Sequence, residues 1–180
     1  MSGARNDIDL LTACVKIAMD SASKVEQNIL EKLETSAATG LINGLRIIRL
    51  QRTILVIGIY SLFESLLQDE MRWDQPFDRL AECLKSKGHE ALADRFHKYR
   101  LAMNVLKHGE GPSYKLLRKE SADLEFQVKK NADEFFFEGD VAEGQPLICV
   151  DNAFVEHFAE IVESALAIVR GIKGDTKRHR

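Results

Sequence analysis

Cysteine and proline are both scarce in this chain of 180 residues. The three cysteines, Cys14, Cys83 and Cys149, are scattered and form no Cys-x-x-Cys pair. An odd number of scattered cysteines argues against a disulfide framework and predicts reduced thiols in the cytosol. Because the chain has only three prolines, long helices can run without interruption.

Neither a membrane span nor a secretion signal is expected. The most apolar run, residues 54–67, is interrupted by Glu64 and falls short of the ~20 residues that a membrane span needs. Residues 1–7 have no apolar stretch of the signal-peptide kind. We therefore predict a cytoplasmic protein without a membrane partner.

Signatures of several enzyme classes are also missing. The sequence has no glycine-rich phosphate loop, no serine nucleophile elbow and no histidines at metal-ligand spacing, so we expect no metal and no cofactor. The formal net charge of −3 gives no general attraction for nucleic acid, so RNA would require a local basic patch. A hydrophobic fraction of 45% and a charged fraction of 29% are ordinary for a globular protein.

The apolar residues recur mostly at helical spacing, which predicts a mainly α, up-down helical bundle of about five to six helices. We expect one domain over residues 1–173 and a disordered tail over residues 174–180. The expected helices cover residues 7–34, 45–72, 76–88, 90–107, 113–126 and 151–171. The segments 135–137 and 147–150 flank a loop rich in Gly, Asp and Glu, which predicts a small β-hairpin before the last helix.

The helix expected over residues 90–107 carries an unusual polar stripe. At ~100° per residue, Arg100, Asn104 and His108 follow one another along one side at i, i+4 and i+8. The main apolar face borders one edge of this stripe, and Leu101 and Val105 border the other. Two apolar sectors predict that the helix packs on its own bundle and on another surface, with the polar stripe lining the seam between them.

The end of this helix resembles a known family. The stretch Asn104-Val-Leu-Lys-His108-Gly-Glu-Gly111 is similar to the signature helix end of HEPN (higher eukaryote and prokaryote nucleotide-binding) domains. The segment Ile59-Tyr-Ser-Leu-Phe-Glu64 looks like the family's helix with an embedded carboxylate, and Pro146-Leu-Ile-Cys-Val-Asp151 is similar to some bacterial members. The resemblance covers roughly Arg46 to Gly171. It implies a HEPN-like helical bundle that forms a homodimer, and many HEPN proteins are metal-independent ribonucleases.

The HEPN motif is an Arg, a short spacer and a His, often with a polar residue directly after the Arg. Asn104 and His108 match this pattern. The Arg does not match, because Met103 precedes the Asn and seven residues lie between Arg100 and His108, one more than the motif takes. This departure bears on catalysis more than on the fold.

The resemblance implies a role for each polar residue. His108 would be the general acid/base, since His exchanges protons near neutral pH. Arg100 would contact the phosphate through its bidentate fork, Asn104 would orient either group, and Glu64 would be a supporting carboxylate. Arg100 and His108 are ~12 Å apart along one helix axis, so a two-fold dimer would be needed to pair Arg100 of one chain with His108 of the other.

Simpler interpretations of the same residues stay open. His108 can serve as a helix C-terminal cap, and Arg100 with Asn104 can form a partly exposed ladder. Glu64 is either a site carboxylate or the partner of a structural Arg. Four basic residues are candidate RNA-binding positions: Lys107, Arg46, Arg49 and Arg52. For the three arginines, the alternative is an ordinary solvated surface.

The first functional hypothesis is a HEPN-like RNA-directed protein, a metal-independent endoribonuclease of toxin or defence type that acts as a homodimer. Its expected partners are RNA and a cognate antitoxin or other protein. We expect the homodimer because residues 54–67 and the Leu101/Val105 sector together provide more apolar surface than one small bundle needs to bury. The alternatives are a catalytically inactive HEPN-like protein-interaction module and a nucleotide-binding regulatory domain.

Overall fold

The computed structural model describes residues 3–36, 38–131, 134, 136 and 146–178. Within these residues the protein is mainly helical, which confirms the predicted helical bundle. A 3-10 helix, η1, covers Ser121–Asp123. The six α-helices are α1 (Gly3–Leu33), α2 (Thr39–Met71), α3 (Pro76–Ser86), α4 (Glu90–His108), α5 (Pro112–Lys119) and α6 (Asn152–Arg178).

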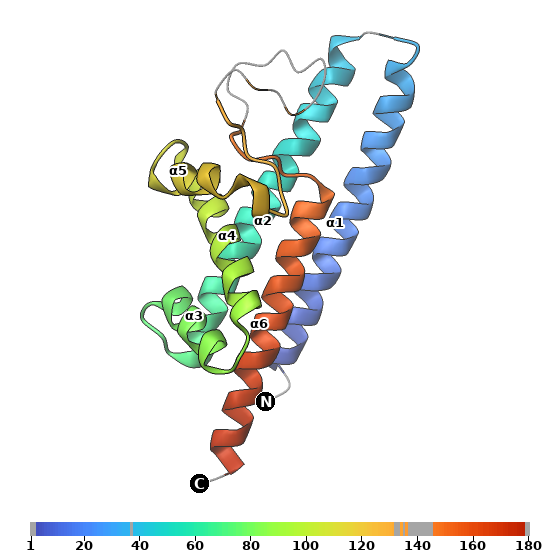
Figure 1. Ribbon diagram of the computed structural model, residues 1–180. Helices are drawn as coiled ribbons and strands as arrows, with labels where there is room; N and C mark the ends of the chain where they lie inside the picture. The colour runs from blue at the N-terminus through green and yellow to red at the C-terminus, as the bar shows by residue number, and fades with distance from the viewer. Residues whose placement is uncertain (1–2, 37, 132–133, 135, 137–145, 179–180) are drawn as a thin grey trace.

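The long helices α1 and α2 form an antiparallel pair, and α6 lies along both of them (Figure 1). Helix α4 packs against α2 and α6, with α3 and α5 near its two ends. Side-chain hydrogen bonds tie the first helix to the last: Asn152 Nδ2 donates to Ser23 Oγ at 2.7 Å, and the Thr12 hydroxyl donates to Glu163. Residues from the two ends of the chain therefore complete one core.

The core contains many aromatic side chains, and α4 lies at its centre. Tyr99 of α4 packs between Phe126 and Phe154, with ring centroids 5.0 Å from each. Leu101 and Val105 are also buried, at 7% and 3% exposure. The expectation that this second apolar sector packs on another surface is therefore wrong, because helices of the same chain cover α4 on all its apolar sides.

The small β-hairpin expected before α6 is not seen in the described residues. Ile148 instead forms an isolated antiparallel bridge with Val128. Two backbone hydrogen bonds flank this bridge, from Lys129 N–H to the Leu147 carbonyl at 2.9 Å and from Cys149 N–H to the Gln127 carbonyl at 3.0 Å. Segment 147–150 thus pairs with residues near Val128 and not with segment 135–137, which was the expected partner. Phe135 and Phe137 of that expected partner lie outside the described residues.

Four helix ends differ by four or more residues from the predicted ones, and the first is the start of α1, at Gly3 instead of residue 7. Helix α2 begins at Thr39, so Gly44 lies inside it and not in a break, and a Cβ at Gly44 would lie 2.8 Å from Ile29 Cδ1 of α1. Helix α5 ends at Lys119, and η1 follows it. Helix α6 continues past Gly171 to Arg178, since one glycine inside a helix costs only about 1 kcal/mol.

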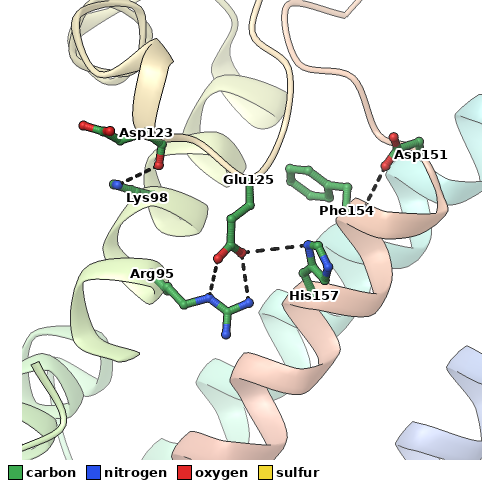
Figure 2. A network of polar contacts seen from close by, with 7 residues as sticks. All are labelled: Arg95, Lys98, Asp123, Glu125, Asp151, Phe154 and His157. Atoms are coloured by element: carbon green, nitrogen blue, oxygen red, sulfur yellow. Dashed lines mark hydrogen bonds and ion pairs between the residues drawn. The ribbon is translucent and has the colours of Figure 1, made fainter. Parts of the chain in front are cut away.

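Polar contacts fasten the segment after η1 to α4 and α6 (Figure 2). Arg95 makes two contacts with Glu125, at 2.8 and 2.9 Å, and Lys98 Nζ donates to the Asp123 carbonyl at 2.9 Å. Asp151 Oδ1 accepts the Phe154 N–H at 2.8 Å, so Asp151 caps the first turn of α6. His157 Nδ1 of α6 lies 3.8 Å from the same Glu125 carboxylate, so Glu125 connects α4 with the first turns of α6.

Helix α2 is the one helix in the described part of the chain whose length and composition would let it cross a membrane. An 18-residue window within it has a mean hydropathy of 1.3, and 33% of that window is buried in the protein. Central helices of soluble proteins meet the same criterion, so it is weak evidence for a membrane location.

Candidate functional site on helix α4

The C-terminal end of α4 is fixed by a glycine. Gly109 has a φ of 73°, a region that side chains with a Cβ rarely adopt, and its N–H donates to the Val105 carbonyl at 2.8 Å. This places Lys107 and His108 in the last helical turn, where the helix dipole favours positive charge. Both side chains are exposed.

Arg100 is held two turns earlier, where α2, α3 and α4 meet. Its guanidinium forms an ion pair with Asp78 of α3 at 2.5 Å and lies 5.9 Å from the centre of the Phe77 ring. Its positive charge also acts on the hydroxyl of Tyr60 on α2, where it opposes the rise in pKa that burial causes. With its side chain only 32% exposed, Arg100 has little freedom to turn toward a ligand.

Tyr60 links several charged residues of this region. The Lys107 ammonium lies 5.6 Å from the centre of the Tyr60 ring. Burial raises the pKa of the Tyr60 hydroxyl, the positive charge of Arg100 opposes this shift, and the negative charge of Glu64 adds to it. Glu64 is half-buried and has no hydrogen bond or ion pair to the described residues. The pairing of Glu64 with a structural Arg is therefore not found among the described residues, although the charge of Glu64 also raises the pKa of Tyr60.

Asn104 lies between Arg100 and His108 and is half-buried. Its amide nitrogen is 3.5 Å from the Ser113 hydroxyl in the first turn of α5, at the outer limit of a hydrogen bond. The polar stripe is thus divided. Arg100 belongs to the end near Tyr60 and Asp78, whereas His108, at the other end, is exposed and makes no hydrogen bond or ion pair with a described residue.

The three arginines at the start of α2 do not share one exposed face. Arg52 is only 4% exposed and pairs with Glu26 of α1. Arg46 is exposed and hydrogen-bonds Asn43 at 3.4 Å, and Arg49 is half-buried. Steps of three residues drift by ~60° each around a helix, so the last arginine of the set points into the α1 contact. Of the four candidate RNA-binding residues, Lys107 and Arg46 are exposed.

Tyr60 and Asp78 belong to the site but were not among the predicted residues. Tyr60 stands one helical turn before Glu64, so it shares the side of α2 that carries the predicted carboxylate. Asp78 could not be found this way, since its pairing with Arg100 depends on how α3 folds back on α4. No group of His, Cys, Asp and Glu suited to a metal ion occurs among the residues that the structure describes.

Comparison with protein-family models, with curated proteins and with solved structures finds no match for this chain.

Proposed function

We propose that this protein is a HEPN-like, metal-independent endoribonuclease of toxin or defence type, with His108 as its proton-transfer group. One observation carries the proposal. His108 is exposed at the end of α4 and makes no hydrogen bond or ion pair with the described residues, and Lys107 and Asn104 belong to the same last turns of the helix. An exposed imidazole on a helix end that also carries a cation and an amide suits proton transfer at an RNA phosphodiester.

The reaction requires no external reactant. His108 takes the proton of a ribose 2′-hydroxyl as that oxygen bonds to the adjacent phosphorus. The bond from phosphorus to the 5′-oxygen breaks, and the leaving oxygen takes a proton from solvent, which leaves a cyclic phosphate and a 5′-hydroxyl. The Lys107 ammonium stabilises the negative charge that builds on the phosphate oxygens. The imidazolium then returns its proton to water.

A catalytically inactive interaction module is the second candidate, and Arg100 favours it. Its guanidinium is held by Asp78 and Phe77. It also stands eight residues before His108, ~12 Å along the helix axis, so the two side chains cannot act on one phosphate within a chain. In this second case the polar stripe serves stability and the protein acts through a bound partner.

We also propose a homodimer, formed through the outer face of α2. Of the nine large hydrophobic side chains exposed in the described residues, eight lie on α1 and α2. The outer face of α2, defined by Ile47, Leu50, Ile54, Gly58, Ser61, Leu62 and Ser65, is ~27 Å long and carries no charged residue. Two equal uncharged faces can cover each other around a two-fold axis. Because this face lies away from Tyr60, each polar stripe would then work alone.

Cleavage of a single-stranded RNA in EDTA by the purified protein tests the catalytic proposal. We expect His108→Ala and His108→Gln to lower the rate by ~10²–10⁴-fold, because neither side chain exchanges a proton near neutral pH. His97→Ala is the matched control, since His97 is an exposed histidine on the same helix, three turns earlier. Wild-type protein that leaves RNA intact would decide for the interaction module. RNA cleavage by the His108 variants at the rate of the His97 control would remove His108 as the proton-transfer group.

A further inference from the structure

The end of α4 and the whole of α5 carry an unbalanced positive charge. We call residues 107–119 the basic α4–α5 segment. It contains four cations, Lys107, Lys115, Arg118 and Lys119, and one carboxylate, Glu110. Its net charge is therefore +3 in a chain whose formal net charge is −3. All four cationic side chains are exposed.

These four cations differ from most of the arginines elsewhere in the described residues. Arg52, Arg79, Arg95, Arg100 and Arg170 each pair with a carboxylate. No cation of the basic α4–α5 segment forms an ion pair with a described residue. Lys107 and Arg118 lie instead over the rings of Tyr60 and Tyr114, each at 5.6 Å. No carboxylate among the described residues therefore pairs with these four charges.

The packing of α5 directs these charges outward and keeps them near His108. Tyr114 and Leu117 are buried on the inner side of α5, which leaves Lys115 and Lys119, one turn apart, on its outer side. Only Gly109, Glu110 and Gly111 separate α5 from the end of α4. The start of α5 therefore lies close to His108 in the chain.

We propose that α5 is the phosphate-binding track that carries the backbone of a single-stranded RNA past His108. This inference rests on the proposed RNA-directed function. Exposed cations that form no ion pair with a described residue are the features that bind a nucleic-acid backbone through release of its counterions. At eight residues α5 is ~12 Å long, too short for the two successive minor grooves that duplex-binding domains contact, so a single strand fits better.

Salt dependence of binding gives a quantitative test. A fluorescent single-stranded oligoribonucleotide of mixed sequence is titrated with the His108→Gln protein, which binds without cleaving. We expect log Kobs to fall with log salt concentration with a slope of about −2.8, or −0.7 for each of four cations. Lys115→Gln with Lys119→Gln should make the slope shallower by about 1.4. The control is Lys85→Gln with Lys87→Gln, two exposed lysines at the end of α3, which should leave the slope unchanged.

The outcomes separate this inference from the catalytic proposal. In the cleaving protein, the double α5 variant should raise KM and leave kcat nearly unchanged, whereas loss of His108 lowers kcat. In a protein that cleaves RNA, the salt slope of binding could be unchanged in the double α5 variant, or changed equally in the α3 control. Either result would overturn the phosphate-binding track and leave the catalytic proposal standing. Binding with the expected slope by a protein that never cleaves would support the track and reject catalysis. Tighter binding of a matched RNA duplex would overturn the single-strand preference.

Discussion

Arg100 and His108 stand on the same side of α4 in very different surroundings. The Arg100 guanidinium is fixed by Asp78 and Phe77, and both contacts would be lost if it turned to bind a phosphate. His108 has no such contact with a described residue. The residue that costs least to engage with a ligand is therefore His108, and Lys107 is the cation closest to it in the sequence.

Tyr99 provides a test at the level of a single atom. Its hydroxyl is buried and has no hydrogen-bond partner among the described residues. Removing an unsatisfied buried hydroxyl is neutral or stabilising when the ring packing is kept. We expect Tyr99→Phe to leave the free energy of unfolding at pH 7 unchanged or to raise it by about 1 kcal/mol, as measured by urea denaturation. A loss of more than about 1 kcal/mol would mean that the hydroxyl has a partner.

The same variant should alter stability at alkaline pH. Burial, and next the charge of Glu125, raise the pKa of Tyr99 above its ordinary value. A raised folded-state pKa contributes stability that is fully present below the unfolded pKa of about 10 and is lost as pH rises above it. Wild type should therefore lose about 1.4 kcal/mol per pH unit more than Tyr99→Phe above pH ~10. Parallel stability curves for the two proteins would contradict this. Tyr60 and Tyr114 contribute to both equally.

Among the elements, α6 depends most visibly on a single cap. Asp151 Oδ1 accepts the Phe154 N–H, one of the four N–H groups that a helix start leaves without a partner. Asp151→Ala should cost about 1 kcal/mol and lower Tm by roughly 2–4 °C in calorimetry. Asp151→Asn keeps an oxygen acceptor and should stay close to wild type. Equal losses in both variants would assign the effect to the charge rather than to the cap.

Helix positions followed from local patterns wherever the controlling residues are close in sequence. The end of α4 was predicted within one residue, because Gly109, Gly111 and Pro112 stop a helix locally. The start of α2 lies earlier than predicted, because Gly40 and Gly44 are inside the helix and do not interrupt it. Periodicity along one helix cannot distinguish a glycine that ends a helix from a glycine inside one.

The candidate site was predictable to the same extent. The polar stripe on α4 and the carboxylate on α2 depend on spacing within one helix, and both lie near Tyr60. The Arg100–Asp78 and Arg52–Glu26 pairs each join two helices, so they depend on packing that no local pattern contains. The sequence alone therefore does not show which cations form ion pairs within the protein, because that depends on how the helices pack.

For the whole molecule, the exposed apolar surface gives the clearest prediction. If the outer face of α2 joins two copies, light scattering of the wild type should give twice the chain mass of 20.3 kDa. Ile54→Glu should give a folded monomer, because this side chain is 62% exposed and its replacement leaves the core intact. Leu116→Glu on α5, 43% exposed, is the control and should remain dimeric. A wild-type monomer at micromolar concentration would reject the homodimer.

The contacts between α1 and α6 also govern the order in which the protein can mature. The hydrogen bonds from Ser23 to Asn152 and from Thr12 to Glu163 join residues separated by most of the chain. During synthesis, α1 and α2 emerge long before the helix that supplies Phe154 and Phe158 to the core. The nascent chain therefore presents apolar helix faces until α6 has been synthesised, which is the state that chaperones recognise. The core of this domain can therefore be completed only after α6 has been synthesised.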